Sequence, residues 1–237
     1  MGEFTYSLNP KKYLPHEFPR RTVTIQASRD VCSPSDKFMD TDKDNFMVAF
    51  KWAETNKMML YNRQQVTFEY ETDWGLKAVL QGKLEENESC GHMTFTTLDK
   101  PIPKEFNKTG NGDFIRTTEV TAKLRYAPGE TYINNKLRRR VINLDAPVLS
   151  VSHTTGFDGV FGGEYSYNYT EVGLHKRFWM GNSWGKLDFY LKGGIQWNQV
   201  PYPLLIHPAA NQSYVILPET FSLINTIQSG KGRGFIT

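Results

Sequence analysis

Long stretches of alternating apolar and polar residues run through most of this sequence. In residues 186–197, Leu187, Phe189 and Leu191 alternate with polar or charged positions. Successive side chains of a β-strand point to opposite faces of a sheet, so this alternation predicts strands with one apolar and one polar face. The same pattern recurs in residues 22–27, 66–71, 76–84, 116–126 and 164–179. We therefore expect an all-β, antiparallel fold of about eight to ten strands and no amphipathic helix.

The runs are longer than the strands of ordinary globular proteins. Residues 116–126 and 186–197 extend for more than about ten residues each, whereas globular strands average about 5–6 residues. Strands that cross an outer membrane at a tilt need about 9–11 residues. Aromatic residues stand near the expected strand ends, as in the interfacial belts of membrane barrels: Trp52, Tyr126, Trp179, Trp184, Trp197 and Tyr202. Strand length thus favours a partial transmembrane β-barrel.

The connections between the expected strands differ strongly in length. Residues 73–75 and 180–185 form short turns, whereas residues 32–45, 100–113 and 127–147 form long polar segments. Outer-membrane barrels have short periplasmic turns and long outer loops. A soluble sandwich more often keeps all of its connections short. We interpret the three long segments as outer loops.

Composition agrees with a soluble β protein and with a membrane barrel. Aromatic residues make up 14% of the chain, yet its mean hydropathy is −0.51. A stretch of about 18 apolar residues, which a transmembrane helix needs, is absent. In a barrel, the polar lumen face and the long loops dilute the apolar face, so low hydropathy is compatible with lipid. The net charge of +3 gives no reason to expect a nucleic-acid partner.

Residues that could carry catalysis or bind a cofactor do not form a known pattern. Residues 181–185 match the Gly-x-Ser-x-Gly motif of serine hydrolases, but that motif needs a following helix, and a strand is expected here. Cys32 and Cys90 are too far apart for a zinc motif, and a disulfide between them is the less favoured reading. We expect no enzyme activity, no cofactor and no metal site.

A basic segment lies in the third long connection. Lys136, Arg138, Arg139 and Arg140 stand close together there. Arginine binds phosphate through two parallel hydrogen bonds, so we consider this segment a contact for lipopolysaccharide or for an acidic patch of a partner. A solvated charge run is the simpler alternative.

Several short motifs occur in an order that resembles a known family. They are LRYAPGE at residues 124–130, GGEYSY at 162–167, VPYPLL at 200–205, NQSY at 211–214 and FSLIN at 221–225. This order resembles the C-terminal barrel of a Bacteroidota outer-membrane family. Members of that family carry a carboxypeptidase-regulatory-like domain ahead of a barrel of the BamA and TamA surface-antigen type.

The resemblance implies a location and a function. Residues 1–237 would form one segment of a barrel in the cell outer membrane, incomplete at both ends. Its partners would be outer-membrane lipid and client outer-membrane proteins, which it would help to insert, translocate or assemble at the surface. Arg233, Gly234 and Phe235 resemble the inward loop of BamA-like barrels, whose arginine forms a salt bridge in the lumen.

The alternative is a soluble, secreted β-sandwich that binds carbohydrate in a lectin-like manner. In that fold Trp179, Trp184 and Trp197 would stack on sugars or on a protein partner. The two folds differ in the surroundings of four apolar residues of one strand. A barrel leaves these side chains exposed as one band, whereas a sandwich packs them against a second sheet: Leu187, Phe189, Leu191 and Ile195.

Overall fold

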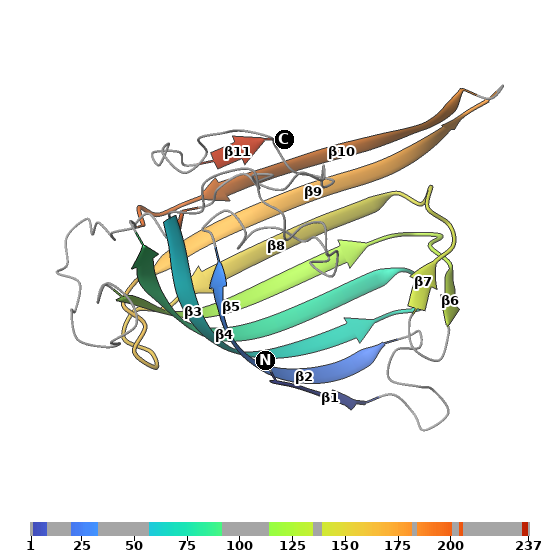
Figure 1. Ribbon diagram of the computed structural model, residues 1–237. Helices are drawn as coiled ribbons and strands as arrows, with labels where there is room; N and C mark the ends of the chain where they lie inside the picture. The colour runs from blue at the N-terminus through green and yellow to red at the C-terminus, as the bar shows by residue number, and fades with distance from the viewer. Residues whose placement is uncertain are drawn as a thin grey trace.

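The protein folds into one large antiparallel β-sheet (Figure 1). The computed structural model describes residues 2–8, 20–32, 57–91, 114–134, 139–181, 184–200, 204–205 and 234–236. The strands of the sheet, in spatial order, are β1 (Gly2–Ser7), β2 (Arg21–Cys32), β3 (Lys57–Glu71), β4 (Leu76–Gly91), β5 (Phe114–Tyr126), β8 (Val148–Gly156), β9 (Tyr167–Met180), β10 (Gly185–Gln196) and β11 (Gly234–Ile236).

The remaining strands, β6 (Tyr132–Asn134) and β7 (Arg139–Val141), form a separate small hairpin between β5 and β8. The described residues contain no α-helix. Within these ranges, accordingly, no helix is long and apolar enough to cross a membrane. The prediction of an all-β antiparallel fold is confirmed.

The alternation of the sequence corresponds to the two faces of the sheet, but it underestimates β3 and β4. β3 has 15 residues and β4 has 16, and they pair over almost their whole length. The sequence pattern reveals only residues 66–71 and 76–84 of them. Toward the other end of this hairpin the two faces do not differ in polarity: polar Asn62 and Arg63 of β3 lie on opposite faces, and so do apolar Met58 and Met59. Because the two faces do not differ in polarity there, the sequence does not alternate and the strand cannot be recognised from it.

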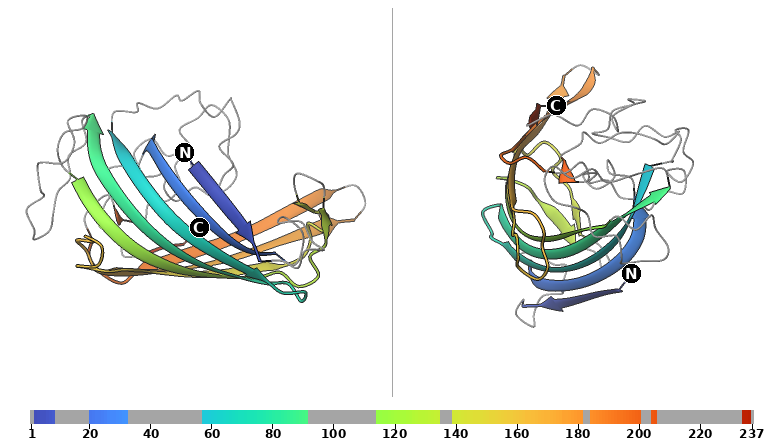
Figure 2. Two further views of the ribbon diagram at one scale, coloured as in Figure 1. Left: turned by 90° about the horizontal axis from the view of Figure 1, so that it is seen from below. Right: turned by 90° about the vertical axis from the view of Figure 1, so that its left-hand side faces the viewer.

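The sheet curves strongly, so that it has a concave and a convex face (Figure 2). Its spatial order begins with β1 and ends with β11, and these two strands are not paired with each other. The described strands therefore form an open curved sheet. The expected closure into a barrel is not observed in this part of the chain.

The two ends of the sheet carry different connections. The hairpins β3–β4 and β9–β10 are joined at one end, here called the turn end, by residues 72–75 and 181–184. The β2–β3, β4–β5 and β8–β9 connections lie at the opposite end, here called the loop end. The connection of residues 127–147 lies at the turn end, because Ala127 N donates to Gly75 O at 2.9 Å. The interpretation of all three long segments as loops on one side is therefore wrong for this one.

The turn between β3 and β4 requires a glycine. Gly75 has φ +89°, and a Cβ at this position would lie 2.4 Å from the carbonyl oxygen of Ala127. Thr72 closes the turn, since its hydroxyl donates to Leu76 O at 3.0 Å. The tight turn predicted at residues 73–75 is confirmed, and its backbone lies directly against the start of the next connection.

A small apolar cluster lies on the concave face near the loop end. Its strand residues include Cys32, Met59, Ile115 and Tyr167, which face inward on β2, β3, β5 and β9. Val200 and Leu204 pack against them, so the segment that follows β10 returns onto the concave face. The motif of residues 200–205 thus contributes two buried side chains to the interior.

Candidate functional site

The convex face of the sheet carries a band of exposed apolar side chains. These residues occupy alternate positions on successive strands and point away from the interior. In a soluble protein, so large a contiguous apolar surface marks a contact with another apolar phase or partner. We call these residues the apolar band: Ile25, Val66, Phe68, Leu80, Val120, Leu124, Val151, Val172, Leu174, Leu187, Phe189, Leu191 and Ile195.

The apolar band gives way to polar residues toward the loop end. On β3 the outward positions change from Val66 to Gln64, and on β4 they change from Leu84 to Glu86. β5, β8 and β9 change in the same way, whereas the outward side of β10 stays apolar as far as Ile195. We call the outward residues beyond this boundary the polar collar: Asn62, Gln64, Glu86, Arg116, Thr118, His153 and Thr170.

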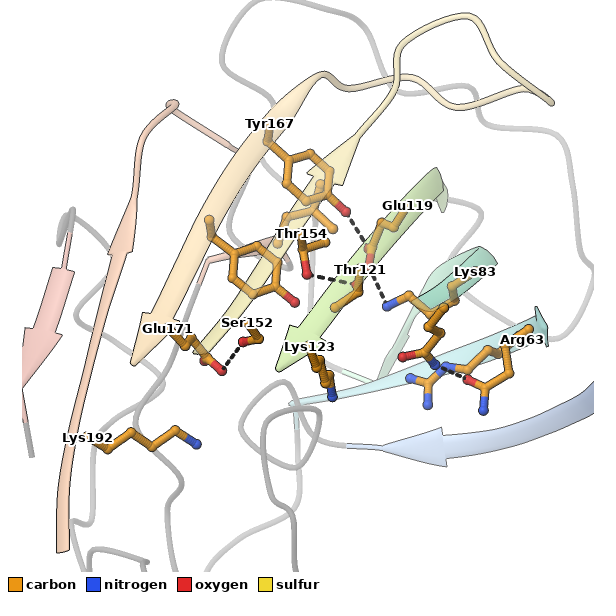
Figure 3. A pocket seen from close by; sticks show the side chains of 14 residues that line it. Arg63, Lys83, Glu119, Thr121, Lys123, Ser152, Thr154, Tyr167, Glu171 and Lys192 are labelled. Carbon is orange, nitrogen blue, oxygen red and sulfur yellow. Dashed lines mark hydrogen bonds and ion pairs between the residues drawn. The ribbon is translucent and has the colours of Figure 1, made fainter. Parts of the chain in front are cut away.

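The concave face is polar and contains a network of ion pairs (Figure 3). Lys83 Nζ lies 2.7 Å from Glu119 Oε2 and 3.5 Å from Glu85 Oε2. Arg63 Nε binds the same Glu85 oxygen at 2.7 Å. Both carboxylates are almost completely buried, with 4% of the Glu119 side chain and none of the Glu85 side chain exposed. Two cations thus compensate two buried acids across three strands.

Tyr167 extends this network to β9. Its hydroxyl donates a hydrogen bond to Glu119 Oε1, and its ring lies over Gly156 of β8. The strand register places Lys83, Glu119, Gly156 and Tyr167 in one row across the sheet. The missing side chain of Gly156 leaves the space that the ring fills, and the neighbouring strand covers the glycine with an aromatic ring.

A polar cavity lies beside this network on the concave face. It has a volume of about 180 Å³, and residues from β3 to β10 line it, including Lys123, Glu171 and Lys192 (Figure 3). A second cavity of about 530 Å³ continues toward the turn end and shares several of these residues. Only on the concave side can strands this far apart line one space. The concave face thus has a polar interior that spans most of the sheet.

A separate group of polar side chains fixes the start of the β5–β8 connection at the turn end. Both terminal nitrogens of Arg125 bind the carboxylate of Glu130, at 2.5 and 2.8 Å, and Tyr132 donates to the same carboxylate. Such a two-point contact between guanidinium and carboxylate has a defined orientation. It holds the strand β6 close to the end of β5.

The predicted basic contact lies partly outside the described residues. Lys136 and Arg138 are not described, whereas Arg139 and Arg140 belong to β7. Arg140 is exposed. The hairpin that carries them is at the turn end, with the short turns, and not at the loop end. Contact with lipopolysaccharide or an acidic partner stays a prediction.

Two residues of the Arg-Gly-Phe motif lie in a strand, where a loop was expected. Gly234 and Phe235 lie in β11, opposite Ile195 and Gly194 of β10, and Arg233 lies outside the described residues. Its role in a lumen salt bridge therefore remains a prediction.

The tryptophans of the lectin-like alternative do not meet in one place. Trp179 and Trp184 are exposed at the tip of the β9–β10 hairpin, and Trp197 follows the opposite end of β10.

Trp52 and Tyr202, predicted for the aromatic belt, lie outside the described residues, as do the motifs of residues 211–214 and 221–225. Strand β10 begins at Gly185, the last residue of the Gly-x-Ser-x-Gly motif, so the helix that a hydrolase motif needs is absent there.

The cysteines and the histidines form no joint site in the described part of the chain. Cys32 and Cys90 are not bonded to each other. His175 stacks on Tyr190 with ring centroids 4.2 Å apart, whereas His153 hydrogen-bonds to Thr170 on the convex face. Over these same ranges, no group of three His, Cys, Asp or Glu residues could hold a metal ion.

The ion-pair network of the concave face was not foreseen from the sequence. Lys83, Glu85 and Glu119 occupy polar positions of sequence runs in which apolar and polar residues alternate. The sequence therefore shows that these charged residues lie on the polar face of the sheet. Their pairing depends on the register between β4 and β5, which are joined by a long connection. The sequence does not reveal that register. The alternation indicates only which face of the sheet each residue lies on, and not which residue of the next strand lies opposite.

Comparison with known proteins gives one match. No curated protein and no solved structure shows a significant match to the chain. The model of one family matches residues 45–222, which is well over half of the chain, and its description is the C-terminal domain of a family of unknown function, DUF5686. The chain therefore belongs to the DUF5686 family.

Proposed function

We propose that this chain forms part of the wall of a β-barrel in the outer membrane of a Gram-negative cell. The convex face would lie against lipid, and the concave face would line the lumen. The observation that carries the proposal is the division of the sheet into an exposed apolar band and a polar, ion-paired concave face. A soluble β-sandwich has the opposite arrangement, with its apolar side chains between two sheets.

The size of the apolar band supports this proposal. About a dozen large apolar side chains of the band are between 37% and 53% exposed. Burying the exposed part of so many side chains is worth on the order of 10 kcal/mol. That is comparable to the net stability of a whole domain, about 5–15 kcal/mol. Lipid would supply this burial over the entire face.

The exposure of four apolar residues of β10, whose surroundings differ between a barrel and a sandwich, also supports a barrel. Leu187, Phe189, Leu191 and Ile195 are between 45% and 52% exposed. The other sheet in the described part of the chain is the hairpin β6–β7, which has two strands of three residues. It is too small to cover them.

The positions of the apolar band and the polar collar suggest an orientation. The apolar band extends toward the short turns, and the collar lies at the loop end. Outer-membrane barrels have short turns in the periplasm and longer loops outside. With the loop end outside the cell, Arg140 would lie on the periplasmic side. The proposal therefore includes no contact between the basic segment and the lipopolysaccharide of the outer leaflet.

By its resemblance to the surface-antigen barrels, we propose that the protein assists the insertion, translocation or surface assembly of other outer-membrane proteins. Two incompletely paired strands support this role. In the described part of the chain, β1 has a neighbour on one side only, and β11 covers just Gly193–Ile195 of β10. Unpaired strand edges can accept a strand of another chain.

The experiment that tests the membrane proposal is fractionation of cells that produce the full chain. We expect the protein in the outer-membrane fraction, resistant to extraction by high salt and by carbonate, and soluble only with detergent. A monodisperse, soluble protein that needs no detergent would exclude the barrel and favour the secreted sandwich. The assembly role is tested separately, by the amounts of other outer-membrane proteins in cells that lack the gene, which we expect to fall.

A further inference from the structure

The loop between β8 and β9 is held firmly against β5. Strand β8 ends at Gly156, opposite Glu119, and the loop continues the pairing with the rest of β5. Phe157 N donates to Thr118 O at 2.9 Å, and the Thr118 hydroxyl donates to Val160 O at 2.7 Å. Glu164 N donates to Arg116 O at 3.1 Å. These bonds fix the loop at the level of the polar collar.

Phe161 at the tip of this loop has an unusual conformation. Its φ is 48°, in the left-handed region that a bulky side chain rarely adopts, and 83% of the residue is exposed. Such a conformation costs about 1–3 kcal/mol. A side chain this exposed returns little packing energy to the fold. Strained residues of this kind gather at binding and catalytic sites, where the strain positions a group for a ligand.

A polar cavity lies next to Phe161 on the convex face. It has a volume of about 270 Å³ and is lined by Asn62 and Gln64 of β3, Glu86 of β4, and Arg116 of β5, among others. Small-molecule sites typically have volumes of about 300–1,000 Å³, so this cavity suits a ligand of one ring.

The polar groups of the cavity are already positioned. Arg116 Nε lies 2.7 Å from Glu86 Oε1, and Asn62 Nδ2 lies 3.5 Å from Glu86 Oε2. The Arg116 guanidinium also lies over the ring of Phe114, 5.2 Å from its centroid. The charges of Arg116 and Glu86 compensate each other. An anion therefore gains little here, whereas a neutral ligand with several hydroxyl groups finds donors and acceptors side by side.

We propose that this cavity binds a neutral sugar ring, with Phe161 packing on its apolar face. Arg116, Glu86 and the amides of Asn62 and Gln64 would bind the hydroxyl groups. The cavity lies at the boundary of the apolar band, and Leu84 of β4 is one of its lining residues. Under the proposed function this is the level of the sugars of outer-leaflet glycolipids, and the identification of the ligand as a glycolipid headgroup rests on that function. Sugar binding itself does not.

The test is saturation-transfer difference NMR on the full chain in detergent, with the methyl glycosides of glucose, galactose, mannose and N-acetylglucosamine as probes. We expect saturation transfer to at least one glycoside. Phe161→Ala should raise the Kd by roughly three- to tenfold through loss of the aromatic contact. Phe161→Tyr should retain binding. Val160→Ala, at the neighbouring exposed position of the same loop, should leave the Kd within about twofold.

Three results would overturn the sugar site. They are no transfer to any of the four glycosides, equal binding by Phe161→Ala and the wild type, and, in vesicles of phospholipid alone, a blue-shifted difference between the tryptophan emission of Phe161→Trp and that of the wild type, which has five tryptophans of its own. The last result would show a ring inserted in lipid. The NMR experiment needs no bilayer. A negative NMR result would therefore exclude the sugar site without affecting the membrane proposal, which is tested by fractionation.

Discussion

Tyr167 and Gly156 form a contact that depends on the absence of a single side chain. A Cβ at Gly156 would lie 2.4 Å from Tyr167 Cε1, so Gly156→Ala must displace the ring and the hydroxyl that binds Glu119. We expect a loss of about 1–3 kcal/mol in the free energy of unfolding, measured by urea titration in detergent. Gly82→Ala is the matched control, because a Cβ there meets no atom within 4 Å. Equal losses in the two variants would contradict the contact.

Lys83 compensates two buried carboxylates, and its removal leaves them with fewer cations. Lys83→Met should lower the free energy of unfolding by about 3–5 kcal/mol, because Glu119 stays buried without its ion pair. The double variant Lys83→Met and Glu119→Gln should recover most of that stability, since residue 119 is then uncharged and the buried Glu85 keeps its ion pair with Arg63. If the double variant is as unstable as the sum of its single variants, the two residues are not coupled.

The residue scale is also where sequence reasoning was least informative. Inward charges such as Lys83 and Glu119 are visible in the alternation, but their distance depends on a register set across residues 92–113. The conformation of Phe161 has no sequence signal, because a positive φ is expected at the glycines beside it and not at a phenylalanine.

Strand β4 allows the two faces of the sheet to be compared at neighbouring residues. Leu80 belongs to the apolar band, and Gln81 lines both cavities of the concave face. Leu80→Arg should destabilise the protein in lipid vesicles by about 2–4 kcal/mol, because it puts a charge in the lipid. Gln81→Arg should cost much less, since this side chain points into the polar cavities of the concave face. If Gln81→Arg is the more damaging change, the convex face does not contact lipid.

At the scale of elements, the sequence predicts a strand well where its two faces differ in polarity. Residues 116–126 and 186–197 correspond closely to β5 and β10 for this reason. Near the loop end the two faces of β3 and β4 do not differ in polarity, since β4 is polar on both faces and Met58 and Met59 of β3 lie on opposite faces, so the extent of these strands could not be read from the pattern. The hairpin β6–β7 was not expected, because three-residue strands are too short to show a period.

For the whole molecule, the account requires that one face of a single sheet meets lipid and the other meets water. The most direct measurement is electron paramagnetic resonance of spin labels placed singly at residues 78–82 of β4, in vesicles, with Cys32 and Cys90 replaced by alanine. Oxygen, which concentrates in lipid, should relax the labels at 78, 80 and 82, and a water-soluble nickel complex should relax those at 79 and 81. Equal exposure of all five labels to the nickel complex would contradict a lipid-facing convex surface.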